Sequence, residues 1–142
     1  MKDLKPTCKI AVVQAAPIMF DKAACTEKAV SLIQECALKN AELIVFPELF
    51  IPGYPYGMTF GFSVGQRTEE GRKDWMLYYR NSILVPGEET RLLGEAAKKA
   101  HAWVSIGVSE RDAVTATLYN SNLVFSPDGE LVFCHRKLKP TG

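Results

Sequence analysis

Short apolar runs and one amphipathic segment share the first part of the chain. Residues 9–14 (KIAVVQ) predict a strand. Residues 43–46 (LIVF) predict a second strand, which is apolar on both faces and therefore expected inside a sheet. Between them, apolar residues recur at helical spacing from an expected N-cap at Asp21 to about Lys39. This part of the chain therefore has the order strand, helix, strand.

The later part of the chain begins with helical spacing and changes to period-two alternation near residue 102. Residues 69–82 predict a weak helix, residues 83–87 a short extended piece, and residues 88–101 a second clear helix. Strands are then expected at residues 102–110, 116–125 and 130–137, the last two joined by the turn sequence SPDG. This order predicts an α/β protein with a mixed sheet.

Residues 49–66 form an uncharged stretch of about the length of a membrane span. Glycines recur in it every four residues, as in the packing motif of membrane helices. However, Pro52 and Pro55 each remove a backbone donor and disfavour a helix at the preceding residue. We interpret the stretch as an ordered glycine-rich loop and expect no membrane association, with a membrane span as the alternative.

Composition narrows the class of protein. The 142 residues are a one-domain length, and 47% hydrophobic with 23% charged residues is typical of a soluble globular protein. A net charge of +1 argues against a nucleic-acid partner, which would need a basic face. The N-terminus has no apolar signal segment, so a cytoplasmic location is expected. The four cysteines show no metal-binding spacing.

Glu48 follows the second predicted strand, with only Pro47 between it and the apolar run. Ligands of α/β proteins bind outside the carboxyl ends of strands, so this position suits an active-site carboxylate. Neighbouring Phe46 and Phe50 are expected to desolvate the carboxylate and raise its pKa, as suits a general base. The alternative is an ordinary strand-end glutamate that turns to water or caps a nearby amide.

Lys137 ends the last predicted strand. Alternation places it on one face with Phe133 and His135, and places Cys134 on the opposite face. A lysine at the end of a row expected to face the core either supplies a positive charge to a site or extends its amine to the rim. His135 is interpreted as a packing or hydrogen-bonding residue rather than a ligand.

Two long motifs resemble the nitrilase branch of the carbon–nitrogen hydrolase superfamily. They are FPELFIPGYPYG at 46–57 and LYNSNLVFSPDGELVFCHRKLKPTG at 118–142. Shorter matches occur in the family's order, at 9–17, 85–87 and 106–111. The fold that this resemblance implies is the α-β-β-α sandwich with a mixed sheet, of which residues 1–142 would supply the N-terminal half.

The resemblance also implies residue roles. Glu48 falls on the family's general base, Lys137 on its catalytic lysine, and Tyr54 on a tyrosine that borders the substrate pocket. The implied reaction converts a small nitrile to a carboxylic acid and ammonia through a cysteine thioimidate and thioester. It needs no metal and no organic cofactor.

The family's third catalytic residue is a cysteine in a segment that would follow the lysine motif, and the sequence ends before it. None of the cysteines present is a good substitute; these are Cys8, Cys25, Cys36 and Cys134. We expect the chain to carry the glutamate and lysine of a Glu-Lys-Cys triad and to be inactive alone. Its sequence also ends directly after a strand, which leaves part of a sheet uncovered.

Two alternatives stay open. The whole protein could be an amidase or a cyanide-converting relative, or the chain could be a non-catalytic half-domain that acts with a partner chain. The resemblance further implies a homo-oligomer, a dimer or a spiral assembly, for the full-length protein. Residues 58–75 resemble the family's assembly region, with an ordinary surface loop as the alternative.

Overall fold

One mixed sheet of five strands forms the centre of the computed structural model, which describes residues 7–58, 60 and 68–139. The spatial order of the strands follows the chain. Strands β1, β2 and β3 are parallel to one another, and β4 is antiparallel to both β3 and β5. The strands are β1 (Ile10–Val12), β2 (Leu43–Val45), β3 (Trp103–Arg111), β4 (Leu118–Phe125) and β5 (Leu131–Arg136).

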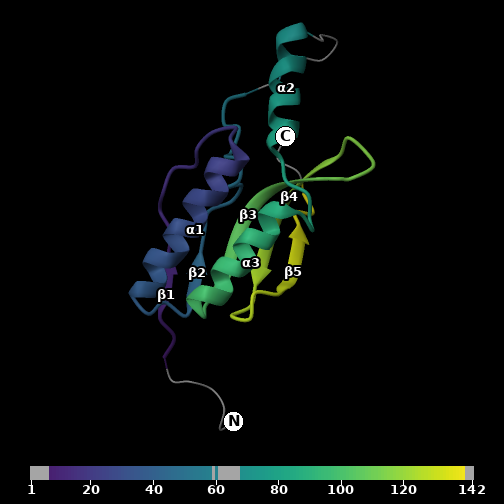
Figure 1. The fold of residues 1–142 in the computed structure, drawn as a ribbon. Coiled ribbons are helices and arrows are strands. Elements are labelled where there is room, and N and C mark those ends of the chain that lie inside the picture. The colour runs from purple at the N-terminus through teal and green to yellow at the C-terminus, as the bar shows by residue number, and fades with distance from the viewer. Residues whose placement is uncertain (1–6, 59, 61–67, 140–142) are drawn as a thin grey trace.

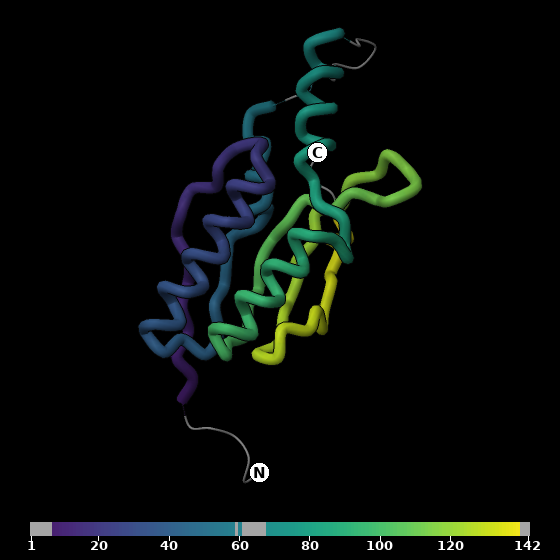
Figure 2. The backbone as a smooth tube through the Cα atoms, viewed as in Figure 1, coloured from purple at the N-terminus to yellow at the C-terminus, as the bar shows by residue number. Residues whose placement is uncertain are grey.

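Three helices accompany the sheet: α1 (Lys22–Leu38), α2 (Glu69–Asn81) and α3 (Glu88–Ala100). Figure 1 shows α1 and α3 side by side on one face of the sheet, whereas α2 extends beyond the sheet's end, and the tube in Figure 2 shows the same layers. No described helix covers the opposite face, which we call the open face. The described part of the molecule is therefore a two-layer α/β structure, as the element order predicted.

The expected N-cap of the first helix is confirmed. The Asp21 carboxylate accepts a hydrogen bond of 2.9 Å from the backbone N–H of Ala24, which satisfies one of the donors that a helix start leaves without a partner. The helix buries Cys25, Ala29 and Ile33, which lie four residues apart on one face. Helical spacing in the sequence therefore located both the helix and its core-facing side.

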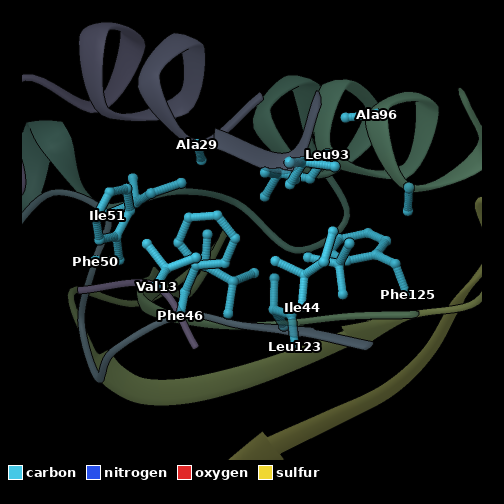
Figure 3. Packing of buried hydrophobic residues seen from close by; sticks show 14 of the residues in the cluster. Val13, Ala29, Ile44, Phe46, Phe50, Ile51, Leu93, Ala96, Leu123 and Phe125 are labelled. Carbon is cyan, nitrogen blue, oxygen red and sulfur yellow. The ribbon is translucent and has the colours of Figure 1, made fainter. Parts of the chain in front are cut away.

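The core lies between the sheet and the two covering helices, as the close view in Figure 3 shows. Ile44 of β2 and Leu123 of β4 meet Ala29 of α1 and Leu93 of α3 there, and all four are fully buried. Burying a leucine or isoleucine contributes about 1.5–3 kcal/mol. One face of each strand therefore provides most of the apolar burial.

Two expectations about burial are wrong, because no described helix covers the open face. In β2, Ile44 is fully buried, but Leu43 and Val45 are only half-buried, so the strand is not buried on both faces. In β5, Phe133 is 54% exposed, so the row expected to face the core lies on the open face instead. In both strands the cause is that helices cover one side of the sheet only.

The glycine-rich stretch contains no helix in its described part, residues 49–58 and 60. Residue 59 and residues 61–67 lie outside the described residues, and with them much of the expected assembly region. Among the described helices, none combines the length and the apolar character that a membrane crossing requires. The helical alternative for this stretch therefore finds no support in the residues that are described.

Candidate active site

Glu48 lies on a turn that continues β2 along the edge of β3. Backbone hydrogen bonds join Phe46 N–H to the carbonyl of Ser105, and Gly107 N–H to the carbonyl of Pro47. A Cβ on Gly107 would lie 2.5 Å from the backbone nitrogen of Leu49 and 2.7 Å from the Cα of Glu48. The turn therefore lies directly on β3, and it can do so because position 107 has no side chain.

Lys137 is placed by the end of β5. Its backbone N–H donates to the carbonyl of Asn120 at 2.8 Å, which extends the pairing with β4 by one residue. Alternation then directs Lys137 to the open face and Arg136 to the helix-covered face. The prediction that Cys134 and Lys137 lie on opposite faces is consistent with their contacts: Cys134 Sγ lies 3.7 Å from Glu110, and Lys137 contacts Glu48.

Glu48 and Lys137 form a direct ion pair on the open face. The Lys137 Nζ lies 2.9 Å from Oε1 of Glu48, and their side chains are 39% and 48% exposed. The side-chain amide of Asn120 donates to the same oxygen at 2.6 Å. Both donors therefore meet the same carboxylate oxygen, Oε1.

These contacts overturn the expected pKa of Glu48. Hydrogen bonds from Lys137 and then from Asn120 lower the pKa of this carboxyl group, and the opposing effect of burial is smaller. Phe46 and Phe50 do not desolvate the carboxylate, because they pack against each other in the core, where they are almost fully buried. The hydrogen bond with Glu48 also raises the pKa of Lys137. At neutral pH Glu48 is therefore an anion and Lys137 a cation.

A shallow hollow of about 250 Å³ opens beside the ion pair. It is bordered by the turn after β2, by strands β3 and β4, and by β5 with the residue that follows it. The lining residues are Glu48, Gly107, Asn120, Ser121, Asn122, His135 and Lys137. Among the described residues, no group of acidic, histidine and cysteine side chains has an arrangement that could hold a metal ion. The side chains that line the hollow offer one carboxylate, one ammonium group, one imidazole and two amides.

Two other residues singled out in the sequence have different surroundings. Tyr54 does not contribute to the lining of the hollow, although its charge interaction also raises the pKa of Lys137. His135 does line the hollow, and its ring stacks in parallel on Phe133 with the ring centres 6.0 Å apart. The packing role expected for His135 agrees with this contact.

Two of the cysteines, Cys25 and Cys134, have contacts other than the Glu48–Lys137 pair. Cys25 is fully buried in the core, where its thiol donates to the carbonyl of Ile18 at 3.0 Å. Cys134 lies beside Glu110, and burial followed by the charge of Glu110 raises the pKa of its thiol. A raised pKa disfavours the nucleophilic thiolate. Neither of these two cysteines meets the requirements of a nucleophile acting with Glu48.

Sequence reasoning missed Asn120. The segment LYNSN carried a usable signal, because asparagines at alternate positions 120 and 122 must share one face of a strand. That face is the open one, where Asn122 contacts the hydroxyl of Ser105 and Asn120 contacts Glu48. Only the register of β3, β4 and β5 shows which asparagine reaches the carboxylate.

Comparisons with known proteins find similarity along almost the whole chain. Residues 9–141 match the family described as carbon-nitrogen hydrolase. The aliphatic nitrilase of Sinorhizobium fredii is 49% identical over 134 residues, which are 94% of this chain and 42% of that protein. The bifunctional nitrilase/nitrile hydratase NIT4B of Nicotiana tabacum is 43% identical over 136 residues, or 96% of this chain and 38% of that protein.

Among solved structures, Nit3 of Saccharomyces cerevisiae, a member of branch 10 of the nitrilase superfamily, has a TM-score of 0.69 and 25% sequence identity. The match covers 93% of this chain and 44% of that chain. The mixed sheet and its helices are thus a fold found in nitrilase-superfamily structures. The chain spans about two fifths of the length of the curated relatives named above.

Proposed function

The chain belongs to the carbon–nitrogen hydrolase family, and from this premise we propose that the natural protein carrying these residues hydrolyses a small nitrile to a carboxylic acid and ammonia. Residues 1–142 would be the N-terminal part of its single catalytic domain. They would supply the glutamate and the lysine of a Glu-Lys-Cys triad, while the cysteine comes from outside them. The observation that carries the proposal is the Glu48–Lys137 pair at the rim of the hollow.

Glu48 would act as the general base. Its lowered pKa keeps it ionised at neutral pH, so its carboxylate can accept a thiol proton. The resulting thiolate adds to the nitrile carbon and forms a thioimidate. The proton that Glu48 took from the thiol passes through Lys137 to the nitrile nitrogen, so Glu48 is ionised again when it takes a proton from the water that attacks this intermediate. Ammonia leaves, and a second water hydrolyses the remaining thioester, so each nitrile consumes two waters.

Lys137 would act on the nitrile nitrogen. Attack on the carbon moves an electron pair to that nitrogen, and a cation beside Glu48 stabilises the developing negative charge or donates a proton to it. Its charge is maintained at neutral pH, because the hydrogen bond to Glu48 raises its pKa. Tyr54 is proposed to border the substrate pocket, on the strength of the motif that contains it and of its charge interaction with Lys137.

The test is to incubate the natural protein with aliphatic, aromatic and arylacetic nitriles, and to measure ammonia and acid together. Ammonia and acid in equal amounts are expected. The 142-residue chain alone is expected to release none, since it lacks the proposed nucleophile. If the 142-residue chain alone hydrolysed a nitrile, the proposal that the catalytic cysteine lies outside it would be contradicted. If the natural protein formed no product from any of the nitriles, the proposed function would be contradicted.

A second product is favoured by one specific observation. The Nicotiana tabacum relative, at 43% identity, is named as a bifunctional nitrilase and nitrile hydratase, and an amide is the product of nitrile hydration. Product analysis of acid against amide separates the two outcomes, and the same analysis detects an amidase or a cyanide-converting enzyme. A homo-oligomer, a cytoplasmic location and action with a partner chain stay predictions.

A further inference from the structure

Glu110 is a buried carboxylate for which the proposed reaction has no use. It lies in β3 on the same face as Val108, and its side chain is only 3% exposed. Val108 itself is fully buried in the core. A carboxylate is costly to bury unless cations and hydrogen-bond donors surround it. A glutamate that continues a row of core residues therefore needs an explanation in terms of its partners.

Those partners come from β4 and β5. Arg136 contacts Glu110 through two nitrogens, with Nη2 at 2.7 Å from Oε1 and Nε at 3.2 Å from Oε2. The hydroxyl of Ser121 donates to Oε2 at 2.6 Å. The guanidinium of Arg136 also lies over the ring of Tyr119, 3.8 Å from its centre. Glu110 thus has a two-pronged ion pair that only an arginine can make.

Arg136 directly precedes Lys137, so the two cations lie on opposite faces of the same strand end. Among the described strands, β5 lies at the edge and pairs only with β4, and this pairing already contains a register shift between Val124 and Phe125. A further slip by one residue would exchange the faces of the two cations. Charge alone would not prevent this exchange, because a cation would find a glutamate on either face of the sheet. Glu48 lies on the open face and Glu110 on the helix-covered face.

We propose that Glu110, Ser121 and Tyr119 form a register lock, which holds Arg136 on the helix-covered face and thereby places Lys137 against Glu48. The lock distinguishes arginine from lysine in two ways. Glu110 accepts two hydrogen bonds from one planar guanidinium group, and the same group stacks on the ring of Tyr119. These residues are positioning residues, since they act on the reaction only through Lys137. The inference rests on the proposed function for its kinetic consequence, but the placement of Lys137 can be observed independently.

The test uses Glu110→Gln and Arg136→Lys in the natural protein, with Glu130→Gln as the matched control. Glu110→Gln keeps the side-chain shape and removes the charge, and Arg136→Lys keeps the charge and removes the fork. Glu130 is an exposed glutamate in the turn between the same two strands. Both lock variants should lower kcat on an aliphatic nitrile by at least about tenfold, because displacing a catalytic group by about 1 Å is costly. KM should change less, and Glu130→Gln should behave as the wild type.

A crystal structure of each lock variant supplies a second readout. The expected result is loss of the 2.9 Å contact between Lys137 Nζ and Glu48 Oε1. A purely structural role would reduce the yield of folded protein and leave kcat per folded molecule unchanged. Wild-type kcat and an unchanged contact in the folded variants would overturn the lock. If Glu110→Gln does not fold, Arg136→Lys decides by the same two readouts.

The two proposals fail separately. A wild-type protein without activity on nitriles would refute the proposed function, while a displaced Lys137 in the variant structures would still support the lock. An active wild type together with unaltered lock variants would refute the lock and leave the function standing.

Discussion

The Lys137 ammonium nitrogen lies 2.9 Å from Oε1 of Glu48, although 89 positions separate the two residues in the chain. The contact joins a turn after the second strand to the end of the fifth, so it depends on the pairing of β2, β3, β4 and β5. Asn120 donates to the same oxygen. The carboxylate is therefore ionised at neutral pH and held by two donors at one of its oxygens.

Replacing Glu48 with glutamine should abolish most nitrile hydrolysis by the natural protein. Glutamine has the same shape but cannot accept a proton at neutral pH, and general acid–base catalysis contributes a factor of about 10²–10⁴. The fold should be retained, because the Glu48 side chain is 48% exposed. The measurement is ammonia release at saturating nitrile, with circular dichroism to check folding. Glu130→Gln is the control, and a folded Glu48→Gln variant with wild-type turnover would refute the role of general base.

Replacing Asn120 with alanine should shift the acidic limb of the pH profile to higher pH. The Asn120 amide stabilises the ionised form of Glu48 and so lowers its pKa, and its removal should raise that pKa. Since the base must be ionised to act, kcat/KM should begin to fall at a higher pH than in the wild type. The measurement is the pH dependence of kcat/KM on an aliphatic nitrile.

Asn122→Ala is the comparison for this variant. Asn122 lies on the same face of β4 but hydrogen-bonds to Ser105. Its removal should leave the position of the acidic limb unchanged, whatever it does to substrate binding. Equal shifts in the two variants would mean that Asn120 has no specific effect on Glu48.

Period-two alternation was the most informative signal in the sequence. It separated Cys134 from Lys137, and it located the last three strands to within a few residues of their observed ends. It could not identify the partner of Glu48, because that depends on register between strands, and the pairing of β4 with β5 contains a shift. The order of residues along one strand does not show how that strand is shifted in register against its neighbour.

The pKa of Glu48 could not be predicted from its sequence neighbours. Phe46 and Phe50 suggested desolvation, yet both side chains pack into the core and the carboxylate lies on the open face. Its pKa is set by Lys137 and Asn120, which are distant in sequence. The apolar run at 43–46 correctly indicated a strand, β2. One face of that strand is partly exposed because the described helices cover only the other face of the sheet.

Replacing Lys137 with methionine should make stability less dependent on pH at both ends of the range. The pKa of Glu48 is lowered in the fold, so the pair's stabilisation is complete above the unfolded-state pKa and is lost as pH falls through the folded-state pKa. The pKa of Lys137 is raised, so the stabilisation is complete below its unfolded-state pKa and is lost as pH rises through the folded-state value. The effect should be small, because both side chains are more than one-third exposed.

The measurement is urea unfolding of the wild type and Lys137→Met from acid to alkaline pH. The free energies of unfolding should differ most near neutral pH and converge at the two extremes. A constant difference across the whole range would show that the lysine stabilises the fold by packing of its alkyl chain rather than by its charge.

Replacing Gly107 with alanine should impair the site without touching a catalytic side chain. The added Cβ would lie 2.5 Å from the Leu49 nitrogen and 2.7 Å from the Glu48 Cα, and backbone atoms cannot rotate away. The turn must therefore move off β3, and Glu48 with it, at a cost of about 1–3 kcal/mol in the free energy of unfolding. Both kcat and stability should fall.

Gly94→Ala separates these two effects of the glycine substitution. A Cβ at Gly94 in α3 would lie 2.5 Å from the carbonyl oxygen of Gly129, an equally close backbone contact on the helix-covered side of the sheet. It should lower stability by a similar amount and leave kcat per folded molecule unchanged. If Gly107→Ala and Gly94→Ala lowered kcat equally, the loss would follow from general destabilisation. A loss of kcat confined to Gly107→Ala would instead follow from displacement of Glu48, because only that substitution pushes on the turn that carries the carboxylate.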